Sequence, residues 1–191
     1  MENLAYVFFS AALINNFVLA YFVGLCPFFG VSSRVSTAVR MGGAVVFVMT
    51  ITSLAVSFLN AYVLPAAPYL RLISYIVVIA SLVQIVEITI KKVSPTLFRQ
   101  LGVFLPLITT NCAILYLALF QQARGYDFLE GLFFALGAGA GFTLALFLMA
   151  SLRERAELAD VPSAARSMGL AMIIAASLSM AFMGFAGLFS S

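Results

Sequence analysis

The stretch INNFVLAYFVGLCPFFG, residues 14–30, is apolar enough to lie inside a membrane, yet it carries residues that interrupt a helix. Two asparagines stand near its start, and Gly24, Pro27 and Gly30 occur in its second half. Proline removes a backbone donor and glycine weakens a helix. We therefore predict a broken or re-entrant segment here rather than one straight helix.

The composition of the whole chain indicates an integral membrane protein. Of its 191 residues, 64% are hydrophobic and 9% are charged. A soluble domain of this length has too small an interior to bury so much apolar material. The size suits a single membrane domain, residues 1–191, in contact with the lipid bilayer. No lysine cluster or aromatic-basic pattern indicates nucleic-acid binding.

Six apolar runs follow one another along the chain, and each is close to the 20 or so residues that a spanning helix needs. The expected fold is therefore an all-α membrane protein with six transmembrane helices, of which the first and fourth are broken. The runs cover residues 4–29, 38–58, 70–90, 101–121, 130–150 and 168–189.

The basic residues predict how these helices are oriented. Counted together with the run ends beside them, the loops after the first, third and fifth runs hold two, three and three of the ten lysines and arginines, whereas the other two hold only Arg71 and Arg124. The positive-inside rule then places both termini on the periplasmic or outer side. Three helices per half would insert with opposite orientations, so we predict two inverted repeats, approximately 1–95 and 96–191.

Several kinds of site are disfavoured by what the sequence contains. Histidine is absent, which removes bis-histidine haem, the common zinc sites and any Ser-His or Cys-His nucleophile built from this chain alone. The GAGAG stretch, residues 137–141, lies inside an apolar run with no strand before it. We interpret it as a helix-packing surface rather than a nucleotide-binding loop.

Polar residues inside the apolar runs have two interpretations. Asn15, Asn16, Thr110 and Asn111 either form ordinary hydrogen bonds between helices or support broken helices whose free backbone groups line a central site. Glu87 is an acidic residue inside a predicted span, and Lys91 follows it by four positions. That carboxylate belongs either to an ion pair at the membrane interface or to an ion path.

Cys26 and Cys112 are the only cysteines. Each is a small packing residue, half of a disulfide, or a metal ligand. A disulfide is disfavoured because both positions fall within predicted spans. Two thiolates do not complete the usual four-cysteine shell of an iron–sulfur cluster, so the metal interpretation requires a partner with two more.

Four stretches carry a family resemblance. Through them the chain resembles the A-type membrane subunits of the Rnf (also called Rsx) electron-transport complex and, more distantly, the E-type and D-type subunits of the sodium-pumping NADH:quinone reductase. They are INNFVLAYFVGLCPFFGVS (14–32), LVQIVEITIKKVSPTLFRQLGVFLPLITTNCAI (82–114), LRERAELADVP (152–162) and AFMGFAGL (181–188).

The resemblance implies that Cys26 and Cys112 bind the iron of a [2Fe–2S] cluster shared with the homologous E-type subunit, which supplies the other two cysteines. It implies a bacterial inner-membrane complex that passes electrons between ferredoxin and NAD and couples this to Na⁺ or H⁺ translocation. This chain would be a subunit that binds no nucleotide. Flavins and further iron–sulfur centres are expected on other subunits; the B, C, D and G components of the Rnf complex complete the expected partners.

Two other functions are compatible with the residues themselves. Inverted repeats and broken helices are also the architecture of secondary transporters for ions or solutes, in which the cysteines would be incidental. A structural membrane anchor without a cofactor is the other alternative.

Overall fold

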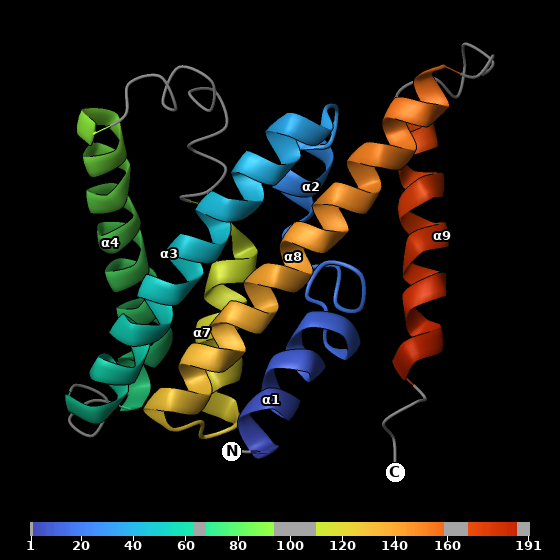
Figure 1. Cartoon of the computed structure of the whole chain (residues 1–191). Coiled ribbons are helices and arrows are strands. Elements are labelled where there is room, and N and C mark those ends of the chain that lie inside the picture. Colours follow the sequence, from blue (N-terminus) through green and yellow to red (C-terminus); the bar gives the residue numbers. More distant parts are fainter. Residues whose placement is uncertain (1, 63–67, 94–109, 159–167, 187–191) are drawn as a thin grey trace.

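The computed structural model describes residues 2–62, 68–93, 110–158 and 168–186, and all regular structure within these ranges is helical (Figure 1). Four of the helices are long and apolar enough to cross a membrane. This confirms the prediction of an all-α, multi-pass membrane protein. The four are α3 (Val35–Tyr62), α4 (Arg71–Val93), α8 (Phe128–Glu157) and α9 (Met168–Ala186).

Shorter elements complete the described structure. Residues Leu4–Ile14 and Cys112–Ala123 form two shorter apolar helical segments beside the long helices. The shorter elements are α1 (Glu2–Phe9), the π-helix η1 (Ser10–Ile14), α2 (Leu25–Val31), the 3-10 helix η2 (Pro68–Leu70) and α7 (Cys112–Ala123).

Helices α3 and α8 form the centre of the bundle and pack against each other along most of their length (Figure 1). Small residues permit this close approach. A Cβ atom added at Gly42 of α3 would lie 2.5 Å from the Thr143 side chain, and one added at Gly139 of α8 would lie 3.0 Å from Val46. The GAGAG stretch is therefore a helix-packing surface.

The same stretch also receives the N-terminal segment. A Cβ atom at Gly137 would lie 2.5 Å from the carbonyl oxygen of Phe8, and one at Gly141 would lie 2.5 Å from that of Ala12. Two turns of α8 thus support α1 and η1 through backbone contact, which no larger residue permits.

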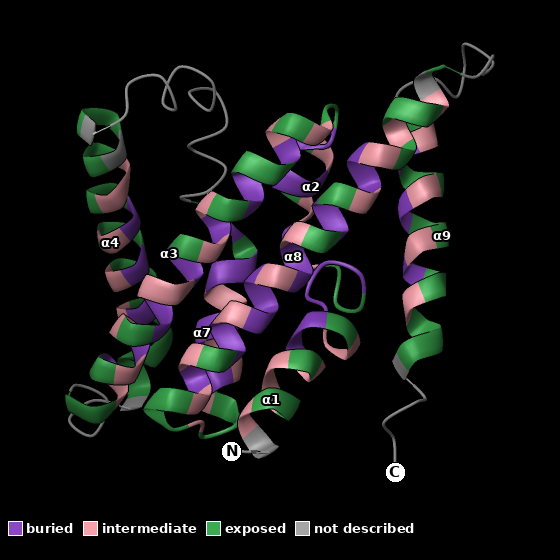
Figure 2. Cartoon of the chain, viewed as in Figure 1, coloured by how far each residue is buried: buried purple, intermediate pink, exposed green. Residues whose placement is uncertain are grey.

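Helices α4 and α9 lie at the two flanks of the bundle, and much of their surface is exposed (Figure 2). That surface is apolar, as expected of helices that face lipid tails or other membrane proteins. Exposed apolar residues on these helices include Ile73, Ile76, Val77, Ile85, Met172, Ile173, Met180 and Met183.

The predicted break in the first apolar run is confirmed. Helical structure ends at Ile14, residues 15–24 form turns, and α2 starts at Leu25. In the fourth run, α7 begins at Cys112, well inside the predicted range 101–121. The part of that run before residue 110 lies outside the described residues, so the second break stays a prediction.

The positions of the helix ends agree with the prediction that both termini lie on the same side of the membrane. Helix α1 begins and α9 ends at the same end of the bundle, where α3 and α7 also end (Figure 1). Which side of the membrane this end faces stays a prediction from the basic residues.

At the opposite end, the RER stretch of α8 joins two other helices. The Arg153 guanidinium donates to the carbonyl oxygen of Phe29 at 3.1 Å and to the Ser32 hydroxyl at 2.9 Å. The neighbouring Glu154 carboxylate accepts from the backbone N–H of Val35 at 3.1 Å. Arg153 thereby provides hydrogen-bond donors at the end of α2, where carbonyl groups lack helical partners. Glu154 provides an acceptor for a backbone N–H group at the start of α3.

Candidate cysteine site at two helix starts

Cys26 and Cys112 each lie in the first turn of a helix. Cys26 is the second residue of α2 and Cys112 is the first residue of α7. Both are free thiols, and both are exposed on the surface of this chain. The first turn of a helix leaves backbone N–H groups without helical acceptors.

The starts of the two helices meet at Gly24. This residue precedes α2 with φ at +83°, a conformation that favours glycine. A Cβ atom added there would lie 3.2 Å from the Cβ of Ala113 and 3.2 Å from the Oδ1 of Asn111. Gly24 is two residues from Cys26, and Asn111 and Ala113 flank Cys112. The fold therefore brings the two cysteine-bearing turns together.

Asn111 caps α7 and leaves one polar group unused. Its Oδ1 accepts a hydrogen bond from the backbone N–H of Ala113 at 3.0 Å. The side chain is buried, and its Nδ2 has no hydrogen-bond partner in the described part of the chain. A buried donor without an acceptor is costly. The acceptor for this amide is therefore not among the described residues.

Asn16 fixes the turn segment of the broken first run. Its Nδ2 donates to the carbonyl oxygen of Gly141 at 2.8 Å, and its Oδ1 accepts from the backbone N–H groups of Val18 and Leu19 at 3.1 and 3.4 Å. The carbonyl oxygen of Leu19 in turn accepts from the Ser179 hydroxyl of α9 at 2.7 Å. These bonds hold the non-helical segment between α8 and α9.

Comparison with known proteins identifies the family. Residues 4–189 match the family described as "Rnf-Nqr subunit, membrane protein". The chain belongs to the Rnf-Nqr family.

Individual Rnf-Nqr relatives match over nearly their whole length. The chain is 53% identical over 190 residues to the A component of the ion-translocating oxidoreductase complex of Syntrophotalea carbinolica, covering 98% of both proteins. It is 47% identical over 190 residues to the protein of that name from Photorhabdus laumondii, again covering 98% of both. The Vibrio campbellii protein is 50% identical over 181 residues, 94% of each chain.

The other polar residues singled out in this Rnf-Nqr chain lie in different places. Asn15 makes two local hydrogen bonds. Its Nδ2 donates to the Ser10 hydroxyl at 3.1 Å, and its Oδ1 accepts from the Tyr21 hydroxyl at 3.2 Å. Thr110 is exposed and immediately precedes Asn111. Glu87 is half-buried on α4, near the helix end that carries Lys91 and Lys92. Both interpretations of this carboxylate, as a member of an interfacial ion pair or of an ion path, stay open.

One polar cluster of this Rnf-Nqr chain was not predicted from the sequence. Gln121 is buried in α7 and bonds Ser53 and Ser57 of α3. The only local signal is the spacing of the two serines, which places them on one face of a helix. Nothing in the sequence indicates that α7 lies opposite them.

Replacing Asn16 with leucine should destabilise the fold by about 2–3 kcal/mol, because the buried N–H groups of Val18 and Leu19 lose their acceptor. We expect the melting midpoint of the purified protein to fall by about 5 °C or more. Asn15→Ala is the matched control, since its bonds are local and partly exposed. Equal melting midpoints for the two variants would contradict this role of Asn16.

Proposed function

We propose that this chain is the A component of an ion-translocating ferredoxin:NAD oxidoreductase complex of the bacterial inner membrane. In this proposal Cys26 and Cys112 supply two of the four ligands of a [2Fe–2S] cluster. The observation that supports it most is the meeting of the two cysteine-bearing turns at Gly24. Both thiols are exposed, so a neighbouring protein of the complex can approach them.

The residues present fit half of a cluster site. Thiolates are the usual ligands of iron–sulfur clusters, which take four of them. The described residues hold no group of three or more histidine, cysteine or acidic side chains that suits a metal ion. The homologous E-type subunit, with its own cysteine pair, would complete the shell. When bound, the cluster would accept and donate one electron at a time. Near the middle of a hydrocarbon core about 30 Å thick, it would divide the distance that an electron has to cross into two shorter steps.

The surroundings of the two cysteines suit an anionic group. A cluster held by four thiolates carries negative charge, which is costly to place within a membrane. The backbone N–H groups of Cys26 and Cys112, in the first turns of α2 and α7, would supply partial positive charge near the two sulfurs. The Nδ2 of Asn111 supplies a further donor that has no partner within the described residues.

The arrangement of the helices supports the proposed inverted repeats. Helix α2 leads into the long helix α3 and α7 leads into the long helix α8, and α2 and α7 end at opposite ends of the bundle (Figure 1). We propose that residues 1–95 and 96–191 form these repeats within one domain, with both termini on the outer side of the membrane.

Asn111 is proposed to donate a hydrogen bond to a cluster sulfur or a ligating thiolate, which would raise the reduction potential. Asn111→Ser keeps a side-chain oxygen that caps α7 but shortens the reach of the donor. Losing a bond worth about 1 kcal/mol should lower the midpoint potential by about 40 mV. Asn111→Asp keeps the cap and adds negative charge, so its potential should fall further. Potentials equal to wild type in redox titrations of both variants would contradict this role.

The experiment that tests the proposed function uses the purified pair formed by this chain and the homologous E-type protein. We expect visible absorption, about two iron atoms per pair and a paramagnetic signal on reduction. A colourless, iron-free pair would contradict the cluster. Solute-dependent flux by this chain alone in vesicles would instead favour the transporter, and neither iron nor flux would favour the anchor.

A further inference from the structure

Helix α2, which carries Cys26, is a short segment between two breaks in the chain. It covers the seven residues Leu25–Val31, and neither residues 15–24 before it nor residues 32–34 after it are helical. The stability of such a short helix comes mainly from packing against other elements. The position of the Cys26 sulfur therefore depends on the contacts that hold α2.

Helix α8 contacts both ends of α2 (Figure 1). At the start, a Cβ atom added at Gly24 would lie 3.1 Å from the Cε2 of the buried Phe142 ring. At the end, the Arg153 guanidinium donates to the carbonyl oxygen of Phe29 and to the Ser32 hydroxyl. The two contact points are about 16 Å apart along α8, close to the length of about 12 Å expected of α2. Helix α2 thus runs along α8 and is supported by it at both ends.

The contact at the end of α2 is directional. One nitrogen of Arg153, Nη1, donates to both acceptors, at 3.1 Å for Phe29 and 2.9 Å for the fully buried Ser32. A guanidinium nitrogen of this kind carries two hydrogens and stays charged at physiological pH. Positive charge is also favourable at the end of a helix. Such bonds fix the rotation and the height of α2, which apolar packing alone does not.

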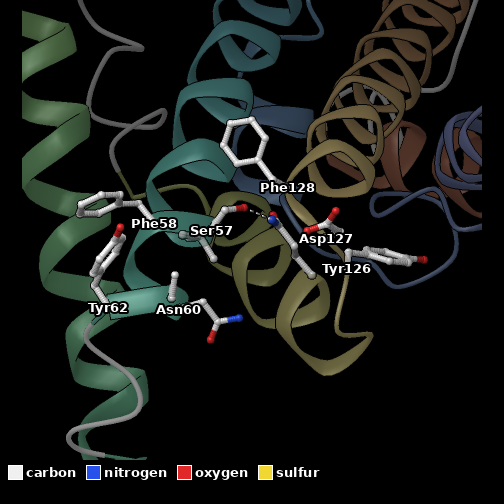
Figure 3. Close-up of a pocket in the computed structure, with 10 residues that line it drawn as sticks. Ser57, Phe58, Asn60, Tyr62, Tyr126, Asp127 and Phe128 are labelled. Atoms are coloured by element: carbon white, nitrogen blue, oxygen red, sulfur yellow. Dashed lines mark hydrogen bonds between the residues drawn. The ribbon is translucent and has the colours of Figure 1, made fainter.

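Helix α7, which begins at Cys112, is supported by a different helix. The Gln121 amide near its end donates from Nε2 to the Ser57 hydroxyl of α3 at 2.8 Å, beside a pocket of about 410 Å³ (Figure 3). Arg153 contacts α2 and the turn after it, so a change at Arg153 acts first on Cys26 and not on Cys112.

We propose that Arg153 is a positioning residue for Cys26. It acts through Phe29, which follows Cys26 by about one helical turn, and it holds the sulfur where the two cysteine-bearing turns meet. Because the anchor is at the far end of α2, the thiol itself stays exposed to a partner. The use of this spacing to bind a cluster rests on the proposed function, whereas the spacing is a property of this chain.

Nitroxide labels on Cys26 and Cys112 test the proposal in the purified full-length chain. These are its only cysteines and both are exposed, so wild type can be labelled at both positions without any substitution. The dipolar coupling between the labels reports their distance with no cluster present. We expect a narrow distance distribution for wild type.

Arg153→Gln should lose the narrow component, because glutamine is shorter and neutral and does not reach both acceptors. Arg153→Lys keeps the charge on a shorter donor group and should restore part of it. Arg155→Gln is the matched control, since it removes the same charge from an exposed side chain of the same stretch. We expect this control to keep the wild-type distribution.

The proposal is overturned if Arg153→Gln keeps the narrow component, or if Arg155→Gln loses it to the same extent. If Arg153→Gln does not yield a folded chain, Ser32→Ala decides in its place. That variant removes the acceptor of the shorter bond without changing the charge. We expect a partial loss of the narrow component, and an unchanged distribution would overturn the proposal.

The iron content of the pair with the E-type homologue separates this proposal from the proposed function. An iron-free wild-type pair, from a chain whose label distance depends on Arg153, would contradict the cluster but support the positioning role. A pair with full iron, from a chain whose label distance is independent of Arg153, would do the reverse.

Discussion

Replacing Cys26 or Cys112 with serine should leave the proposed pair, formed by this chain and an E-type homologue, almost without iron. Serine matches the size of cysteine but does not provide the soft thiolate that binds iron in these clusters. Changes around a metal site already cost 10- to 100-fold in affinity, and losing a ligand should cost at least as much. We therefore expect iron content to fall about tenfold or more in each variant.

The proposed electron transfer from ferredoxin to NAD should fall by at least as large a factor in the same variants. Without a centre at mid-depth, an electron would have to cross a hydrocarbon core about 30 Å thick in one step. The measurement is turnover of the whole complex in membranes, together with the paramagnetic signal of the reduced pair. Full iron and unchanged turnover in either variant would show that the corresponding cysteine is not a ligand.

The cysteine variants should nevertheless assemble. Both side chains are exposed on this chain, so serine leaves no cavity in its core. Ser33→Ala is a suitable control, because Ser33 is exposed just past the end of α2 and is not a candidate ligand. We expect this control to keep wild-type iron content and turnover, with all three variants at similar levels in the membrane.

Gly141→Ala should have the largest effect on stability. The new methyl group would lie 2.5 Å from the carbonyl oxygen of Ala12 and 3.1 Å from the Nδ2 of Asn16. Since the closest atom belongs to the backbone, η1 must move away from α8. Overpacking typically costs 1–3 kcal/mol, and we expect about 3 kcal/mol here because the Asn16 bond to Gly141 is lost as well. The yield of monodisperse protein and its melting midpoint are the measurements.

Gly43→Ala is the matched control for Gly141→Ala. Both glycines lie inside long helices, but a Cβ atom at Gly43 of α3 would meet nothing within 4 Å. Alanine is the better helix former by about 1 kcal/mol, so this variant should be neutral or slightly more stable. Equal losses in the two variants would show that helix contact at Gly141 is not what limits stability.

The sequence by itself determined the class of the protein and the place where its first apolar run is interrupted. Hydrophobic content and run length can be read from the chain alone. Apolar runs of this length form helices in a membrane, because a helix satisfies its own backbone hydrogen bonds. The break before α2 follows from Asn15, Asn16 and Gly24, which act on the backbone within a few residues of themselves. These effects are local, so they can be predicted from the sequence alone.

The tertiary structure alone decided which of these local features meet. Gly24 lies against Asn111 and Ala113, and Gln121 lies between two serines of α3. Such contacts depend on how α7 and α8 are placed against the first half of the chain. Small residues and apolar surfaces permit several helix registers, and the lowest free energy among them is set by packing over the whole bundle. Nothing in the local sequence encodes that choice.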